Sequence, residues 1–311
     1  MSLLSVILPS YNEEAVVEHA ATVLHELFTK EDIPYELLFV NDGSTDATWT
    51  IIKKMNAKNP QIKGIHLSRN FGKEAAILAG LREATGECAI VMDVDLQHPP
   101  ETAVEMYRLW EQGYQIVEGI KASRGNEGIF YKASSKLFYR LIHRASGFDM
   151  QSSSDFKLLD RIAIEAYLQL PERQLFFRAL SYWLGYHQTT VPFHVQERHD
   201  GETKWSSLKL MKYAIANVTS FSALPMQIVT LVGFLFMLFS IGLGIYSLGQ
   251  FLTGNSLEGF TTVILLLLGI GSIMMMSLGI IGYYISKIYE ETKRRPRYLI
   301  SKRTSQENRH A

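Results

Sequence analysis

The chain has 311 residues, 47% of them hydrophobic, and its 31 basic residues balance its 31 acidic ones. This is the composition of an ordinary globular protein, so wholesale disorder is excluded, and the length suggests about two domain-sized units. The single cysteine, Cys88, excludes an internal disulfide framework and a cysteine-rich zinc module.

Short apolar runs alternate with helical patterns over residues 1–203, which we expect to form the first domain. The expected strands are 3–9, 36–41, 63–67, 89–93, 115–118 and, later, 189–195. The expected helices are 13–29, 46–58, 73–84 and 100–112. This alternation predicts an α/β fold with a mostly parallel, Rossmann-like sheet covered on both faces. Ligands of such sheets bind at the carboxyl ends of strands, so residues that follow strands are the candidates for a site.

Polar loops follow the first two expected strands. The first has the sequence P-S-Y-N-E-E at 9–14 and the second N-D-G-S-T-D at 41–46. Neither a G-x-G-x-x-G nor a G-x-x-x-x-G-K-[ST] motif occurs, which disfavours a dinucleotide dehydrogenase and a P-loop nucleotidase. On its own, 41–46 is equally well explained as a turn followed by a helix N-cap.

Three oxygen-bearing side chains, Asp93, Asp95 and Gln97, alternate after the very apolar fourth strand. Carboxylate and amide oxygens suit a hard divalent ion such as Mg²⁺ or Mn²⁺, and an ion with few protein ligands keeps positions open for substrate phosphates. A lone D-x-D usually marks an ordinary loop, but charges at the end of a buried strand need a partner. The pattern therefore predicts a metal–diphosphate site, to which His98 could add a ligand or outer support.

Residues 204–225 have the pattern of an amphipathic helix. Apolar side chains recur at helical spacing, with three lysines nearby, at Trp205, Leu208, Met211, Ile215, Val218 and Phe221. This pattern predicts a helix that lies in a membrane interface. The alternative is a helix packed on the preceding domain.

Two long stretches lack charge, because no charged residue lies between Lys212 and Glu258 or between Glu258 and Lys287. The apolar segments 226–252 and 260–286 each exceed the ~20 residues that cross a hydrocarbon core as a helix. A short connection would make them a transmembrane hairpin over 226–286. Two buried core helices are the disfavoured alternative, since soluble helices rarely continue so long without a charge.

The balanced net charge hides a basic tail at 287–311, where eight basic residues face three acidic ones, so this stretch carries +5 and the rest −5. Such a tail suits nucleic acid or an anionic membrane surface, and the preceding apolar segments favour the membrane, so no nucleic-acid partner is expected. The connecting loop lacks Lys and Arg, whereas both flanks carry them. The positive-inside rule then predicts a multi-pass protein of the cytoplasmic membrane with its first domain and both termini in the cytoplasm.

Seven motifs follow one another along the chain. They are P-S-Y-N-E at 9–13, N-D-G-S at 41–44, R-N-F-G-K at 69–73, D-V-D-L-Q at 93–97, D-F-K-L-L-D at 155–160, R-x-x-G-x-T-K-W at 198–205 and Y-E-x-x-K-x-R-P at 289–296. In this order they resemble family 2 glycosyltransferases with the GT-A fold. The later motifs and the hairpin are similar to the polyprenyl-phosphate (bactoprenol) glycosyltransferase branch, to which dolichol-phosphate mannose synthases belong.

The resemblance implies a reaction: inverting transfer of a sugar from a UDP-sugar to undecaprenyl or another polyprenyl phosphate at the cytoplasmic membrane face, for cell-envelope glycan modification. Glucose is the favoured sugar, with UDP-N-acetylglucosamine and GDP-mannose as open alternatives. A separate flippase, a downstream glycosyltransferase and a homo-oligomer are the implied further partners. A processive polysaccharide synthase is disfavoured because 174–178 departs from its Q-x-x-R-W motif, and a non-catalytic scaffold because the motifs are intact.

The resemblance also assigns residues to the donor side. A Mg²⁺ or Mn²⁺ ion on Asp93, Asp95 and Gln97 would stabilise the negative charge that develops on the leaving diphosphate. The residues implied to bind the nucleotide sugar are Pro9, Tyr11, Glu13, Asp42 and Asp93.

On the acceptor side, Arg124, Arg198 and Lys204 are implied to bind the lipid phosphate, since an anionic nucleophile needs positioning by cations. The implied catalytic residues are Asp155, Asp95 and Arg198. The phosphate is already anionic near neutral pH, so a base is optional. Asp155 is therefore expected to act as the base, to orient the acceptor, or to be a buried ion-pair partner.

Overall fold

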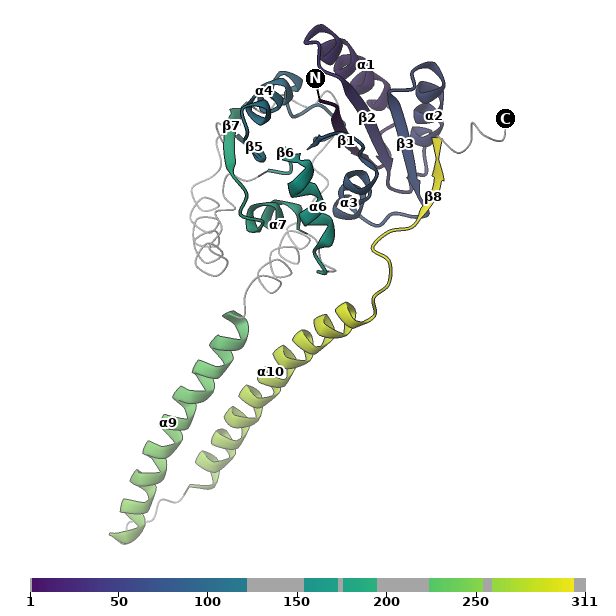
Figure 1. Ribbon diagram of the computed structural model, residues 1–311. Coiled ribbons are helices and arrows are strands. Elements are labelled where there is room, and N and C mark those ends of the chain that lie inside the picture. The colour runs from purple at the N-terminus through teal and green to yellow at the C-terminus, as the bar shows by residue number, and fades with distance from the viewer. Residues whose placement is uncertain (1, 122–153, 173–175, 195–223, 254–258, 305–311) are drawn as a thin grey trace. The chain divides into compact units, whose positions relative to one another are not determined.

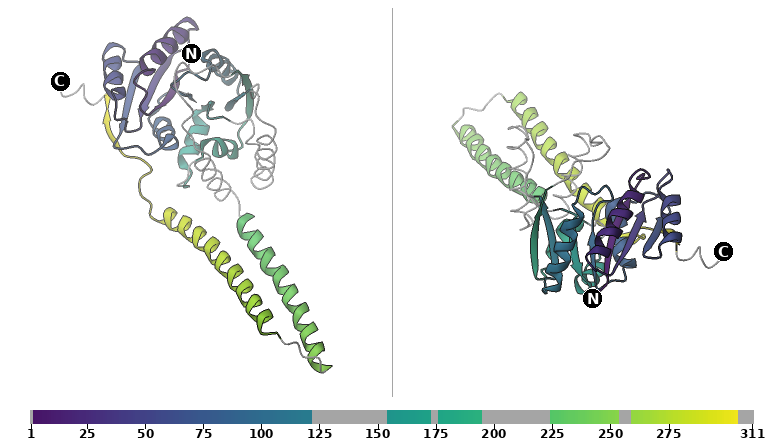
Figure 2. Two further views of the ribbon diagram at one scale, coloured as in Figure 1. Left: turned by 180° about the vertical axis from the view of Figure 1, so that it is seen from behind. Right: turned by 90° about the horizontal axis from the view of Figure 1, so that it is seen from above.

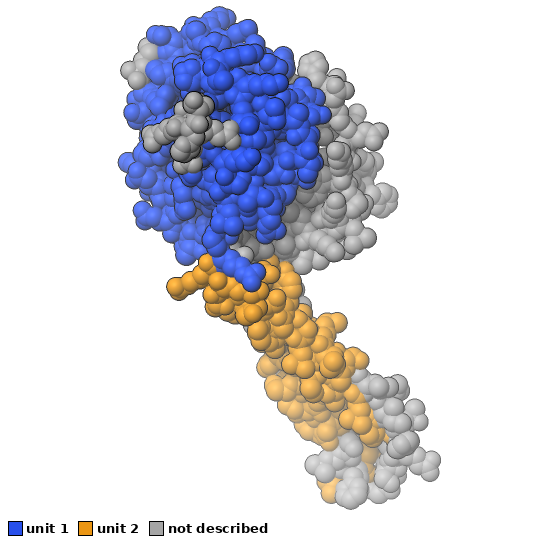
Figure 3. Space-filling model, turned by 90° about the vertical axis from the view of Figure 1, so that its right-hand side faces the viewer, with its two compact units in different colours: residues 1–205, 295–311 blue, residues 206–294 orange. Residues whose placement is uncertain are grey.

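The computed structural model describes residues 2–121, 154–172, 176–194, 224–253 and 259–304 (Figure 1). The chain divides into two compact units (Figure 3). Unit 1 consists of Met1–Trp205 and Arg295–Ala311, and unit 2 of Ser206–Arg294. Unit 1 contains a β-sheet with helices, and unit 2 contains two long apolar helices.

The strands of the described residues form one mixed sheet in the order β7-β5-β6-β4-β1-β2-β3-β8. Their bounds are β1 (Leu4–Ser10), β2 (Tyr35–Asn41), β3 (Ile62–Leu67), β4 (Cys88–Val91), β5 (Ile116–Lys121), β6 (Lys157–Asp160), β7 (Gln188–Phe193) and β8 (Ile300–Arg303). β1 pairs in parallel with β2 and β4, β2 with β3, and β5 with β7. β6 runs antiparallel to β4 and β5. The expected mostly parallel sheet is thus a mixed one, because β6 enters its middle in the opposite direction.

Helices cover both faces of this sheet (Figures 1 and 2). They are α1 (Val17–Lys30), α2 (Thr48–Lys58), α3 (Lys73–Glu83), α4 (Pro100–Glu111), α6 (Arg161–Gln169) and α7 (Phe177–Trp183). Val6 and Leu8 share one core with apolar side chains of α1, α2 and α4. Ile7 points the other way and lies so close to Gly80 of α3 that a Cβ there would be 2.3 Å from its Cγ2. Since successive strand residues face opposite sides, α3 covers the second face.

Unit 2 contains α9 (Leu224–Leu252) and α10 (Phe260–Thr292), which contact each other. Both are long and apolar enough to cross a membrane, over Val229–Tyr246 and Gly269–Thr292. Large apolar side chains along them are exposed, for example Leu235 at 56% and Met275 at 71%. Burying such surface is favourable by about 25 cal/mol per Å², so both helices need an apolar environment. The amphipathic helix expected at 204–225 lies, as far as residue 223, outside the described residues.

Part of the segment 287–311, expected to be a basic tail, forms regular secondary structure. Its first part continues α10 to Thr292, and its middle forms β8, which pairs antiparallel with β3. Arg303 forms an ion pair with Glu83 at 2.8 Å, and the buried Thr304 hydroxyl accepts a hydrogen bond from the Gly64 N–H at 3.0 Å. The I-S-K-R sequence of β8 has no apolar alternation because it is an edge strand, so periodicity did not predict it.

Candidate active site

The carboxyl ends of β1, β2 and β4 meet at one edge of the sheet, because β1 runs parallel to both neighbours. The polar loops predicted from the sequence therefore lie together. Parallel sheets of this kind bind ligands at this edge. Pro9 is half-buried near the end of β1, and Tyr11 follows it with 46% of its surface exposed.

Hydrogen bonds between backbone N–H groups and side-chain oxygens join the loop after β1 to the loop after β2 and to the first residue of α2. The Asn12 N–H donates to Ser44 Oγ at 2.9 Å, and Asn12 Oδ1 accepts from the Thr45 N–H at 2.9 Å. The Glu13 N–H donates to Thr48 Oγ1 at 3.0 Å. Tyr11 and Glu13 thus sit on a loop whose backbone is held in place, as a binding surface requires.

The carboxylate of the buried Asp42 binds the backbone of a third loop, which directly precedes α3. Its two carboxylate oxygens accept from the N–H groups of Phe71 and Gly72, at 2.7 and 2.8 Å. Gly43 has a φ of +68°, and a Cβ there would lie 2.3 Å from the Arg69 backbone, so only glycine fits between these loops. Burial raises the pKa of Asp42 above its ordinary value, although the two hydrogen bonds oppose this shift. Both oxygens of this predicted nucleotide-binding residue are engaged with the backbone that leads into α3.

The D-x-D loop after β4 contains the predicted metal ligands. The Asp93 N–H donates to His98 Nδ1 at 3.2 Å, and the buried His98 ring stacks on Phe156 at 4.6 Å between centroids. Burial lowers the pKa of His98 to about 4, so the ring is neutral and its Nδ1 can accept. His98 therefore supports the loop through the Asp93 backbone. Asp95 Oδ1 accepts from the Gln97 N–H at 3.2 Å.

The donor set of this loop fits a divalent ion of the Mg²⁺ type. Within the described ranges, no group of three His, Cys, Asp or Glu side chains could hold a metal. The loop nevertheless offers two carboxylates and an amide oxygen, the ligand types that Mg²⁺ and Mn²⁺ take together with phosphate and water. A metal ion held by Asp93, Asp95 and Gln97 would need further ligands, such as a diphosphate.

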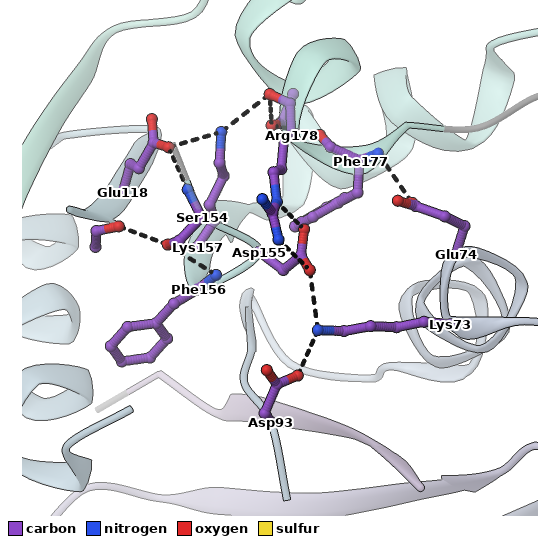
Figure 4. A network of polar contacts seen from close by, with 12 residues as sticks. Lys73, Glu74, Asp93, Glu118, Ser154, Asp155, Phe156, Lys157, Phe177 and Arg178 are labelled. Carbon is purple, nitrogen blue, oxygen red and sulfur yellow. Dashed lines mark hydrogen bonds and ion pairs between the residues drawn. The ribbon is translucent and has the colours of Figure 1, made fainter. Parts of the chain in front are cut away.

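A chain of ion pairs connects this loop to Asp155 (Figure 4). Lys73 Nζ lies 2.5 Å from Asp93 Oδ1 and 2.9 Å from Asp155 Oδ2. Arg178 donates two hydrogen bonds to the same Asp155 carboxylate, from Nε at 2.6 Å and from a terminal nitrogen at 3.0 Å. Two carboxylates and two cations therefore alternate across the site.

These contacts shift the pKa values of the acids. Burial alone would raise the pKa of Asp155, but the ammonium of Lys73 and the guanidinium of Arg178 outweigh it and hold that pKa well below the usual range. The pKa of Asp93 is lowered as well. Burial alone would raise it, but the neighbouring Lys73 ammonium outweighs this effect. Both carboxylates are therefore ionised at neutral pH, and Asp155 is a weak base.

Buried groups hold Arg178 in position. Lys157, 1% exposed, pairs with Glu118 at 3.3 Å and donates to the Arg178 carbonyl oxygen at 3.1 Å. The Phe177 N–H at the start of α7 donates to Glu74 at 2.9 Å. Burial, followed by the charge of Asp155, raises the pKa of Glu74 to about 7. α7 is thereby fastened to both α3 and β6.

The structure brings together only some of the site residues predicted from the sequence. The structure brings Asp93 and Asp155 within reach of one lysine, whereas Arg124, Arg198 and Lys204 lie outside the described residues. Sequence reasoning missed the roles of Lys73, Glu74, Lys157 and Arg178 in the site. Lys73 and Lys157 belong to motifs already recognised, which was the available signal. Arg178 lies in the 174–178 segment that departs from the Q-x-x-R-W motif, so no motif marks it.

Known proteins share this sequence and this fold. The glycosyl transferase family 2 model matches residues 5–168. An uncharacterized glycosyltransferase of Synechocystis is 39% identical over 96% of this chain and 94% of its own. A prophage bactoprenol glucosyl transferase homolog of Escherichia coli K12 is 33% identical over 96% of this chain and 98% of its own.

Among solved structures, glucosyl-3-phosphoglycerate synthase from Mycobacterium tuberculosis, in complex with Mn²⁺, UDP and phosphoglyceric acid, superimposes with a TM-score of 0.51. It is 18% identical and covers 70% of this chain and 78% of its own, a likeness of fold alone. The predicted GT-A-like α/β fold is thereby confirmed. With the family model over more than half of the chain and relatives similar along nearly all of it, the chain belongs to glycosyl transferase family 2 and is a glycosyltransferase.

Proposed function

We propose that the protein transfers a sugar, glucose by preference, from a UDP-sugar to a polyprenyl phosphate such as undecaprenyl phosphate. The observation that carries the proposal is similarity to a bactoprenol glucosyl transferase homolog along 98% of that protein, a span that includes both apolar helices. A lipid acceptor explains why a transferase domain and two such helices share one chain. The product is a polyprenyl-phospho-sugar for cell-envelope glycans.

The donor side lies at the carboxyl ends of β1, β2 and β4. Pro9, Tyr11, Glu13 and Asp42 surround the nucleotide in this proposal, the last by fixing the loop that precedes α3. Asp93, Asp95 and Gln97 would hold Mg²⁺ or Mn²⁺, which when bound stabilises the charge of the leaving diphosphate. A solved structure of the same fold contains Mn²⁺ and UDP, so the fold accommodates this pair.

The acceptor side centres on Asp155. Its pKa lies well below the usual range, so Asp155 is a poor general base, and a phosphate nucleophile that is already anionic needs none. Asp155 instead orients Lys73 and Arg178 near the reacting groups. Arg124, Arg198 and Lys204 complete the cationic surround of the lipid phosphate in this proposal. Transfer then proceeds with inversion, in a single in-line displacement.

The proposed location is the cytoplasmic membrane. α9 and α10 would cross it, and the amphipathic segment 204–225 would lie at its surface. Strand β8 follows α10 yet belongs to the same sheet as β1–β7. Because one folded domain precedes and follows the two helices, this arrangement would put both flanks on the same side, as the positive-inside rule also predicts. A flippase and a downstream transferase would then handle the product.

Sugar transfer by the full-length protein in proteoliposomes tests this function. The assay supplies undecaprenyl phosphate, Mg²⁺ or Mn²⁺, and separately labelled UDP-glucose, UDP-N-acetylglucosamine and GDP-mannose. Label should move into the organic phase with UDP-glucose. Label from another donor would correct the sugar while keeping the reaction, and no lipid product from any donor would refute the lipid acceptor.

A further inference from the structure

Lys73 lies between the two halves of the site. As the first residue of α3, it contacts Asp93 of the predicted metal loop at 2.5 Å and Asp155 at 2.9 Å (Figure 4). Its side chain is 41% exposed, against 34% for Asp93 and 9% for Asp155. The ammonium group therefore reaches both acids while one side of its chain faces open space.

The backbone around Lys73 is fixed. The two preceding residues donate to the buried Asp42 carboxylate, at 2.7 and 2.8 Å. The following residue, Glu74, accepts the Phe177 N–H, and α3 is buried from Ala75 to Leu81. The four-carbon side chain of Lys73 is itself flexible, so it can change partner without moving this backbone.

A divalent ion bound at this loop would compete with the Lys73 ammonium for the Asp93 carboxylate. Mg²⁺ binds carboxylate oxygens at about 2.0–2.1 Å. An ammonium 2.5 Å from Asp93 Oδ1 would then lie within a few ångströms of the ion, where two cations repel strongly. Asp155 also binds Arg178 through two hydrogen bonds, so loss of the lysine would affect Asp93 most.

We propose that Lys73 is a positioning residue that holds Asp93 beside Asp155 before substrates bind, and that a divalent ion arriving at Asp93 displaces its ammonium toward the acceptor side. This inference rests on the proposed function. The displaced ammonium, with Arg178, then faces the anionic acceptor. Binding of the metal and nucleotide would thus build part of the site for the lipid phosphate, which favours donor binding first.

Lys73→Met tests the exchange, because it keeps the length of the side chain and removes the charge. Mn²⁺ binding to the full-length protein in detergent is measured by the loss of the free Mn²⁺ electron paramagnetic resonance signal, with Mn²⁺ alone and with UDP. Without its competitor, Asp93 should bind Mn²⁺ tighter, with Kd lower by roughly fivefold or more. Lys73→Arg, which keeps the charge, should stay within about twofold of wild type.

Lys54→Met is the matched control, since Lys54 is an exposed lysine on α2, a helix that contacts α1, β2 and β3. It removes the same charge and should leave Mn²⁺ affinity unchanged. In the transfer assay, Lys73→Met should raise KM for undecaprenyl phosphate more than KM for UDP-glucose. If Lys73→Met does not fold, Lys73→Gln makes the same comparison.

These measurements distinguish failure of the metal–lysine exchange from failure of the proposed function. If wild type transfers sugar but Lys73→Met binds Mn²⁺ no more tightly, the exchange is refuted and the proposed function stands. A purely structural lysine would give weaker Mn²⁺ binding, which also refutes it. If Lys73→Met binds Mn²⁺ more tightly but no variant forms a lipid product, the exchange stands and the acceptor assignment fails.

Discussion

Replacing Arg178 by lysine separates its charge from its geometry. Arginine grips Asp155 with two charge-assisted hydrogen bonds, at 2.6 and 3.0 Å. Lysine keeps the positive charge but offers a compact ammonium on a flexible stem, which cannot reproduce the planar fork. Asp155 should therefore stay ionised but lose its fixed orientation.

The size of the effect follows from the lost hydrogen bond. A hydrogen bond to a charged group contributes about 1.5–3 kcal/mol to stability. Because the Arg178 side chain is 37% exposed, solvent screening weakens this contribution. We therefore expect the substitution to cost about 1–2 kcal/mol. If this orientation matters in the transition state, kcat falls by roughly 5- to 30-fold.

The assay is sugar transfer to undecaprenyl phosphate at saturating UDP-glucose, with thermal unfolding to establish the folded fraction. Arg108→Lys is the matched control, because Arg108 also pairs with a carboxylate, Glu111, at 2.9 Å, but on the surface. Such pairs contribute at most about 1 kcal/mol, so its kcat should not change. A folded Arg178→Lys variant with the kcat of wild type would show that the Arg178–Asp155 geometry has no part in turnover.

Three further predictions concern other parts of the protein. Asp95→Ala should abolish transfer while membrane insertion, followed by fractionation, stays intact; retained transfer would contradict the metal role. Because the pKa of Glu74 is raised from 4.5 to about 7, its ionisation costs stability as pH rises through this range. Glu74→Gln removes that cost, so its stability relative to wild type should be about 3 kcal/mol better at pH 8 than at pH 4, because each unit of pKa shift corresponds to about 1.4 kcal/mol; equal differences at both would refute the assignment. Thr304→Val leaves the Gly64 N–H unsatisfied and should lower the free energy of unfolding by about 1–2 kcal/mol, measured by denaturant unfolding, whereas an unchanged value would mean that the strand contact is dispensable.

Hydrophobic periodicity predicted much of the fold because the strands of a parallel sheet and the helices on it bury apolar residues in regular patterns. The helices α1 to α4 and the strands β1 to β5 and β7 all form within a few residues of their expected bounds. The four-residue β6, with Lys157 and Asp160 at its ends, gives no such pattern. β8 escaped prediction for a related reason, as a short polar edge strand.

The acids of the candidate site were predictable from the sequence, whereas the partners Lys73 and Arg178 were not identified; the predicted cations Arg124, Arg198 and Lys204 lie outside the described residues. Asp93 and Asp155 stand in recognisable motifs, and the end of a buried strand marks the first of them. Lys73 and Arg178 pair with them only through tertiary packing, which brings four separate segments together. One sequence contains no record of such proximity, so the partners of Asp155 could not be identified from it.

The pairing of β8 with β3 also bears on the order in which the protein is made. The Gly64–Thr304 hydrogen bond joins residues 240 positions apart, and both apolar helices lie between them. During synthesis the edge of β3 therefore stays open until α9 and α10 have left the ribosome, and an open strand edge invites wrong pairing. The sheet can therefore be completed by β8 only after both helices have been synthesised, and this pairing then closes the edge of β3.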